Sequence, residues 1–328
     1  MSFNNDINEK EGRKFFSKIG FIFLGLTLFT ILAQIIMGVI LQPLPKSLTS
    51  NYDFWLLISA LCTYILPIPF FLYFMGKFKK YNMEKKKLGI LQFIACIIVT
   101  FALCYIGNII GITITSIIGN FINSPITNPV NVMVGNSNVL ITFLTVVILA
   151  PIFEELFFRK ILIDRTIKYG GLVSIIISAV LFSLYHGNLN QFFYAFLMGA
   201  FFALIYVKTA KIEYTIILHA LVNFFGSIVA VSIASLLNSG DMQHIENLTE
   251  AEIISNFHQF LPLILAFLIS IFIILIIIIG VILILVYYNK VEIPNGEVSL
   301  KISALFLNGG MFCFVLYYLI MIFGSIFA

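Results

Sequence analysis

The sequence predicts an all-α, polytopic integral membrane protein with about nine transmembrane helices. Of its 328 residues, 61% are hydrophobic and only 10% are charged, and the mean hydropathy is +1.07. Soluble domains are roughly 45 to 50% apolar and about 25% charged. So few charged residues cannot cover the surface of a soluble protein of this size. The composition therefore excludes a soluble enzyme, a nucleic-acid-binding protein and a disordered polymer. The chain also lacks a glycine-rich nucleotide loop, so we expect neither a nucleic-acid nor a nucleotide partner.

Nine apolar runs are long enough to be membrane helices, because about 20 apolar residues cross the hydrocarbon core. The runs are approximately 15–41, 54–75, 88–119, 139–158, 171–186, 190–207, 213–237, 261–288 and 302–327. The first run is longer than the core of a signal peptide and has no convincing small-residue cleavage site. We therefore expect it to be a retained helix.

The basic residues predict the orientation, because lysine and arginine of short loops stay on the cytoplasmic side. With nine crossings and a cytoplasmic amino terminus, 18 of the 19 basic residues fall on that side, and Lys46 is left outside. The longest exterior loop, 238–260, carries acidic residues instead. These are Asp241, Glu246, Glu250 and Glu252. We therefore expect a multi-pass plasma-membrane protein with its amino terminus in the cytoplasm.

A few polar groups lie at membrane depth, where an ionisable side chain costs about 2.5 to 3.5 kcal/mol on insertion scales. They are Glu154, Glu155 and Arg159 in the fourth run, His186 at the end of the fifth, and His219 with Asn223 in the seventh. All six fall within 70 residues, on three helices that short connections can bring together. This concentration predicts a reaction site.

Helical spacing divides these residues into roles. Glu155 and Arg159 are four residues apart, so one ion pair can satisfy both. Glu154 points about 100° away from Glu155 and is free for other work. His219 and Asn223 share one face by the same spacing. A structural salt bridge and hydrogen-bonded core histidines are the simpler alternatives for each feature taken alone.

Three motifs formed by these residues resemble a known family. Glu154-Glu155-x-x-x-Arg159, Phe182-x-x-x-His186 and His219-x-x-x-Asn223 occur in this order on separate apolar runs. The set is similar to that of the CAAX protease and bacteriocin-processing (CPBP, or Abi) family of intramembrane endopeptidases. The resemblance covers approximately 139–228 and implies a CAAX-protease-like core.

The resemblance also implies a division of the chain and a mechanism. Segment 1–138 would hold the amino-terminal tail and three helices, 139–237 the catalytic core, and 238–328 the exterior loop and two final helices. The chain offers no good covalent nucleophile, which leaves water. Glu154 with His186 would hold and deprotonate that water, His219 and Asn223 would hydrogen-bond the oxyanion, and Glu155 with Arg159 would hold the helix in register.

No cofactor is established by the sequence, and a divalent metal such as zinc stays open. Glu154, His186 and His219 are a plausible zinc set that leaves a position for water, and the family is often described as metalloproteases. A metal-free mechanism uses the same residues. The chain has no His-Glu-x-x-His helix, which would have decided between the two.

The expected substrate is a membrane-bound or lipidated peptide or protein, in a cavity reached from the cytoplasmic side. Counting along straight helices places His219 roughly 10 Å from the level of Glu154. A non-catalytic bacteriocin-immunity or scaffold protein is the alternative, and a secondary transporter is a third reading that lacks the usual repeated halves. The sequence does not choose among CAAX processing, bacteriocin processing, peptide maturation and immunity.

Four cysteines, Cys62, Cys96, Cys104 and Cys313, fall inside apolar runs without CxxC spacing. We interpret them as packing residues rather than disulfide partners or metal ligands.

Overall fold

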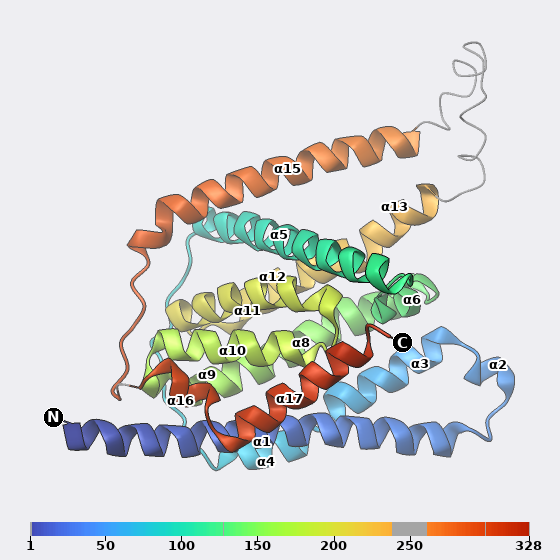
Figure 1. The fold of residues 1–328 in the computed structure, drawn as a ribbon. Helices are drawn as coiled ribbons and strands as arrows, with labels where there is room; N and C mark the ends of the chain where they lie inside the picture. Colours follow the sequence, from blue (N-terminus) through green and yellow to red (C-terminus); the bar gives the residue numbers. More distant parts are fainter. Residues whose placement is uncertain (1, 127, 238–260, 299, 328) are drawn as a thin grey trace, which may run out of the picture.

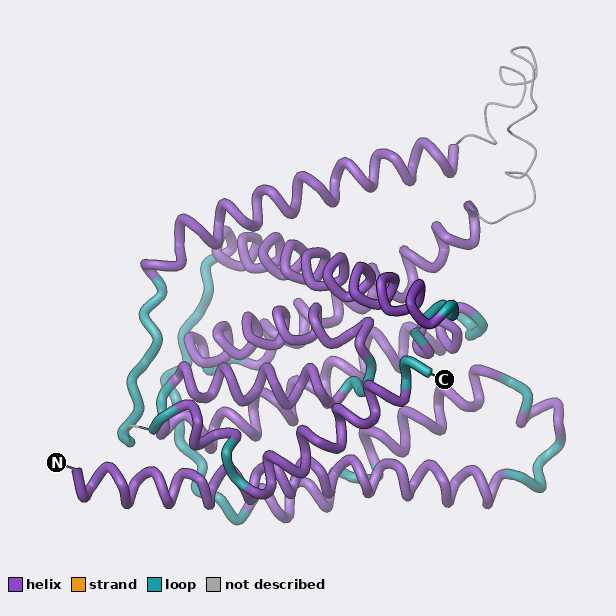
Figure 2. Tube along the Cα trace, viewed as in Figure 1, coloured by secondary structure: helices purple, strands orange, loops and turns teal. Residues whose placement is uncertain are grey.

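The structure, a computed structural model, describes residues 2–126, 128–237, 261–298 and 300–327. The described residues form helices and connecting segments, with no β-strand among them (Figures 1 and 2). This confirms the all-α class. The acidic loop predicted at 238–260 lies outside the described residues.

The amino-terminal half contains α1 (Ser2–Leu41), α2 (Lys46–Thr49), α3 (Tyr52–Ala60), α4 (Ile68–Gly76), α5 (Ile90–Ile122), α6 (Pro129–Gly135) and α7 (Val139–Thr142). Then follow α8 (Ala150–Glu155), α9 (Leu162–Thr166), α10 (Gly171–Tyr185), α11 (Leu189–Thr209), α12 (Ile212–Phe224), α13 (Ala230–Leu237), α15 (Leu261–Tyr287), α16 (Ile302–Phe306) and α17 (Gly309–Gly324). The π-helical turns Leu61–Ile65, Phe143–Leu149, Leu156–Ile161 and Phe225–Val229 join several of these helices into longer rods.

Within the described ranges, seven helical rods are long and apolar enough to cross a membrane. The predicted fifth and ninth runs form shorter apolar helices, α10 and α17, of 15 and 16 residues. At 1.5 Å per residue they span about 22 to 24 Å, less than a hydrocarbon core of roughly 30 Å. Most residues of α10 are buried, so neighbouring helices rather than lipid surround it. The chain is therefore a multi-pass membrane protein.

The basic connecting segments gather at one end of the bundle, where the amino terminus also lies (left in Figure 1). The Lys86 N–H donates to the Thr209 carbonyl at 2.9 Å, and the Val298 N–H donates to the Lys168 carbonyl at 3.1 Å. Segments distant in sequence thus share one layer, as alternating crossings require. We call this layer the basic end; it comprises residues 77–89, 162–171, 208–211, 290–298 and 300–301.

Two features of helix packing position the site. Gly107 of α5 lies against the backbone of Tyr194 in α11, where a Cβ atom would come within 2.4 Å of the Tyr194 Cα atom. This close approach holds α5 against α11. Most of the long apolar helix α15 is exposed, and only 6% of its membrane-length window is buried inside the protein, so it presents an apolar wall to lipid outside α5 (Figure 1).

Candidate active site

The two adjacent glutamates lie in a continuous helical rod that runs from Val139 to Tyr169. The π-helical turns before and after α8 change the register of this rod on both sides of the pair. Such turns are rare in helices and occur frequently at functional sites. The Glu155 side chain is fully buried, whereas that of Glu154 is 12% exposed and lines a cavity. The two carboxylates therefore have different environments.

Glu155 and Arg159 lie against each other inside the protein. The Glu155 Oε2 and Arg159 Nε atoms are 3.2 Å apart, and neither side chain is exposed. The guanidinium carbon lies 4.2 Å from the centre of the Phe182 ring and 5.6 Å from that of Phe202. Stacking on aromatic faces suits the planar arginine cation. The carboxylate and the two rings together surround a charge that would otherwise be costly to bury.

His219 of α12 lies between the two carboxylates. Its Nδ1 atom is 2.9 Å from Glu155 Oε1, and since a carboxylate oxygen only accepts, Nδ1 carries the hydrogen. Its Nε2 atom faces Glu154 Oε2 at 3.7 Å, which is too long for a hydrogen bond. Glu155 thus orients the imidazole as well as meeting Arg159. The expected difference in level does not keep His219 away from Glu154.

Asn223 compensates for an irregularity in the glutamate-bearing rod. The Ala150 N–H bonds to the Thr145 carbonyl in the π-helical pattern, and Pro151 has no N–H to offer to the Val146 carbonyl. The Asn223 side chain fills this vacancy, because its Nδ2 donates to the Val146 carbonyl at 2.9 Å. One amide hydrogen is therefore used within the protein, and the second is left for the cavity that Asn223 lines.

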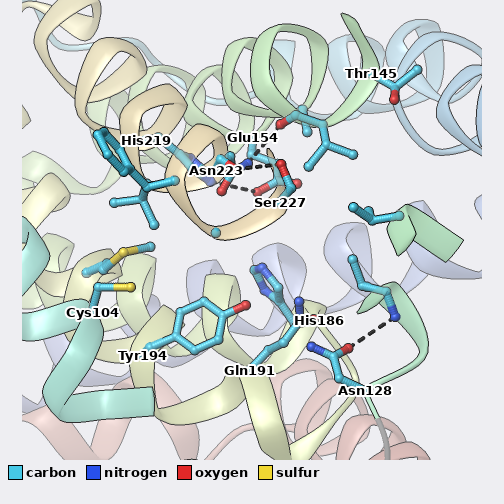
Figure 3. A pocket seen from close by; sticks show the side chains of 18 of the residues that line it. Cys104, Asn128, Thr145, Glu154, His186, Gln191, Tyr194, His219, Asn223 and Ser227 are labelled. Atoms are coloured by element: carbon cyan, nitrogen blue, oxygen red, sulfur yellow. Dashed lines mark hydrogen bonds and ion pairs between the residues drawn. The ribbon is translucent and has the colours of Figure 1, made fainter. Parts of the chain in front are cut away.

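His186 follows the last residue of α10 and approaches the cavity from the wall facing Glu154 (Figure 3). Its Nδ1 donates to the Phe182 carbonyl at 2.9 Å, so the neutral ring presents an Nε2 lone pair to the cavity. The His186 ring also meets the Phe182 ring edge-on at 4.8 Å. No hydrogen bond or ion pair joins His186 directly to Glu154, although both residues are described.

Tyr64 is a site residue that the sequence reasoning missed. Its hydroxyl donates to Glu154 Oε1 at 2.6 Å, and its ring stacks on Phe153 with centres 5.9 Å apart and planes 13° from parallel. Tyr64 belongs to the π-helical turn Leu61–Ile65 of the second rod. A search confined to charged and imidazole groups at membrane depth passes over a tyrosine. A polar hydroxyl in an apolar run just before Pro67 was the available signal.

Glu154, His186, His219 and Asn223 all line one cavity of about 690 Å³, so the structure brings the four predicted residues together (Figure 3). The cavity also has walls from α3, α5, α6, α11 and α13. On α3, α6 and α13 these walls lie towards the end of the bundle opposite the basic end (Figure 1). The cavity therefore extends away from the basic end, whereas the sequence predicted access from that end, the expected cytoplasmic side. The cause is packing, because Phe157 and Phe158, which follow Glu154 towards the basic end, are fully buried.

The three predicted metal ligands do not form a metal site as they are placed. Within the part of the chain that the structure describes, no group of three or more His, Cys, Asp and Glu side chains is arranged to hold a metal ion. Glu154 Oε1 is bonded to Tyr64 and His219 Nδ1 to Glu155. No hydrogen bond or ion pair joins His186 to either of them, although all three line one cavity.

The fold and this cavity define a class: a multi-pass membrane protein with carboxylate and imidazole groups facing a cavity at membrane depth. Residues 136–225 match the model of the Rce1-like family, described as type II CAAX prenyl endopeptidase Rce1-like. The match confirms the resemblance predicted from the three motifs and supports a CAAX-type membrane protease in general. It covers about a quarter of the chain and excludes Tyr64. No curated protein and no solved structure matches the chain.

Proposed function

We propose that the chain is an intramembrane endopeptidase that hydrolyses a peptide bond of a membrane-associated peptide or protein with an activated water. The observation that carries the proposal is the environment of Glu154. This carboxylate lies in a cavity at membrane depth, hydrogen-bonded to Tyr64 and facing the His219 ring. A partly exposed acid with imidazoles on two sides of a cavity is suited to general acid and base chemistry.

In this mechanism Glu154 and His186 hold the water between them. Glu154, the proposed base, takes a proton from the water as the water oxygen bonds to the carbonyl carbon of the substrate. The negative charge on the carbonyl oxygen is stabilised by the second amide hydrogen of Asn223 and by His219 in its protonated form, in which Nε2 carries a hydrogen as well as Nδ1. The C–N bond then breaks and the amide nitrogen takes the proton from the base, so the products are a carboxylic acid and an amine.

Glu155 and Arg159 position the reacting groups in this proposal. Glu155 fixes the tautomer and orientation of His219 through the 2.9 Å hydrogen bond to Nδ1. Arg159 provides the charge that keeps Glu155 ionised inside the protein. Both residues act on the reaction through His219 rather than by touching the substrate.

A comparison of membrane-associated peptides from cells with the wild-type protein and cells with the Glu154→Gln variant tests this function. We expect peptide fragments that are present with the wild-type protein to be missing with the variant, as measured by mass spectrometry of membrane-associated peptides. Glu213→Gln is the matched control, since Glu213 is 55% exposed at the start of α12 and does not line the cavity. Identical fragment patterns for wild type and Glu154→Gln would refute the protease function.

We also propose a plasma-membrane location with a cytoplasmic amino terminus, and a membrane-bound or lipidated substrate. The clustering of basic segments at one end of the bundle supports the orientation. The catalytic core proposed at 139–237 is completed by Tyr64, which lies in the amino-terminal segment 1–138. The flanking helices therefore contribute to the site as well as to the fold.

A further inference from the structure

The cavity and the basic end lie at opposite ends of the bundle. At the basic end, the Tyr206 hydroxyl donates to Asp164 Oδ1 at 2.7 Å and joins α11 to α9. At the other end, the Asn138 N–H donates to Asp53 Oδ1 at 2.6 Å and joins the start of the glutamate-bearing rod to α3. Because lysine and arginine mark the cytoplasmic side, the Asp53 end belongs to the exterior.

Part of the cavity wall lies in the half of the bundle that contains Asp53, which we call the exterior half. Ser59 on α3, Met133 on α6 and Val231 on α13 line the cavity together with Glu154. Figure 1 shows α6, α13 and the start of α3 at the end away from the amino terminus. Towards the cytoplasm, the Arg159 side chain and the aromatic rings around it are completely buried. A substrate can therefore approach Glu154 along the exterior half without displacing this packed layer.

The lining of the cavity is mostly apolar, and apart from Glu154 and the two histidines its polar groups are neutral. Its polar walls are mainly neutral amides and hydroxyls, including Asn108 and Gln191. Glu154 is the carboxylate among the described lining residues, and neither lysine nor arginine lines the cavity there. A second carboxylate beside Glu154 would meet a like charge with no lysine or arginine at the cavity wall to offset it, at a depth where screening by water is weak.

We infer that the cavity receives an uncharged internal segment of a peptide from the exterior side of the membrane, and that it disfavours a free carboxyl terminus beside the scissile bond. This inference rests on the proposed function and names its substrate class. The substrate is an exported peptide, or the exterior-facing part of a membrane protein, whose cleaved bond lies away from the carboxyl terminus.

Cysteine accessibility in intact cells tests the exterior access. Cys104 is a free, partly exposed cysteine that lines the cavity, so a variant with Cys62, Cys96 and Cys313 replaced by alanine keeps a single reporter. A second reporter is Asn108→Cys in a cysteine-free chain. Glu84→Cys in the same cysteine-free chain reports the basic end, because the Glu84 side chain is 80% exposed. The reagent is a membrane-impermeant, positively charged methanethiosulfonate.

We expect at least one cavity reporter to be modified in intact cells, and Glu84→Cys only after the cells are opened. Cavity reporters that react only after opening, or that never react, would overturn the inference. Modification of Glu84→Cys from outside would overturn it too, by reversing the orientation. Labelling does not depend on cleavage, so this result is separate from the failure or success of the protease function.

A pair of synthetic peptides tests the charge preference in purified protein. The two peptides share one uncharged apolar sequence, and one ends in an amide while the other ends in a free carboxylate. We expect the amide to slow the modification of Cys104 several-fold more than the acid, and the difference to disappear in Glu154→Gln. Equal protection by both peptides, or no protection by either, would contradict the inferred substrate class.

Discussion

The Tyr64 hydroxyl donates a 2.6 Å hydrogen bond to Glu154 Oε1, and this bond joins the second helical rod to the fourth. Glu154 is the carboxylate that we propose as the base. A hydrogen bond to an ionised group contributes about 1.5 to 3 kcal/mol, more than a neutral one. The orientation of Glu154 in the cavity therefore depends on a residue outside the segment 136–225 that matches the protease family.

The Tyr64→Phe variant should lower the turnover number roughly ten-fold with little change in KM, because it removes only the donor to Glu154. Steady-state kinetics on a substrate found by comparing membrane peptides provide the measurement. Tyr194→Phe is the control, since Tyr194 lines the cavity without a hydrogen bond to Glu154. Equal effects of the two changes would show that the hydroxyl of Tyr64 has no special role.

The two adjacent glutamates should respond differently to the same substitution. Glu154→Gln should reduce hydrolysis by about 10²- to 10⁴-fold, the usual contribution of a general base, while the thermal unfolding midpoint changes little. Glu155→Gln should lower that midpoint, because it leaves Arg159 without its counter-charge at a site with no exposure. Activity and unfolding in detergent micelles, measured side by side, check this. A shared phenotype would argue against separate roles.

Arg159→Ala should destabilise the protein by about 3 to 5 kcal/mol, the range for breaking a buried ion pair by removing one partner. Arg13→Ala provides the comparison, since Arg13 also pairs with a glutamate four residues away but its side chain is 44% exposed. The change for Arg13 should be far smaller. The measurement is the unfolding midpoint of each variant in the same detergent. Similar shifts would contradict the importance assigned to burial.

Asn223→Ala should cost about 1 kcal/mol, since it leaves the partly buried Val146 carbonyl without its partner. Pro151→Ala supplies an N–H next to that carbonyl, so adding it to Asn223→Ala should recover part of the lost stability. A double-mutant cycle of unfolding midpoints measures the coupling. Strict additivity of the two changes would mean that the missing N–H of Pro151 and the amide of Asn223 are unrelated.

Hydrophobic run lengths and helical spacing predicted much of the fold and part of the site. The all-α class follows from the apolar runs, and the four-residue spacing of Glu155 and Arg159 anticipated their contact. Both are local properties of one helix. The fifth run matches α10 to within one residue. The sequence overestimated the ninth span, because the run 302–327 is interrupted at Asn308, whose side chain accepts from the Met311 N–H and begins α17.

Relationships between helices were harder to predict. The contact of Tyr64 with Glu154 joins residues 90 positions apart, and no periodicity reports it. The spacing of His219 and Asn223 predicted that they share one face of a helix. It did not predict their partners, which are Glu155 for His219 and the Val146 carbonyl for Asn223. The cavity also extends away from the basic end from which access was predicted. Hydropathy gives depth along a helix, whereas the position of a cavity depends on how side chains fill the space between helices.

The shortness of α10 bears on how the reaction obtains its other reactant. Each cleavage consumes one H₂O, which must reach a site at the depth of the hydrocarbon core. Because α10 spans about 22 Å, less than a hydrocarbon core of roughly 30 Å, the residue that follows it, His186, reaches the cavity that also holds Glu154. The same cavity that admits a peptide thus gives water a route to the imidazole, and hydrolysis needs no second channel.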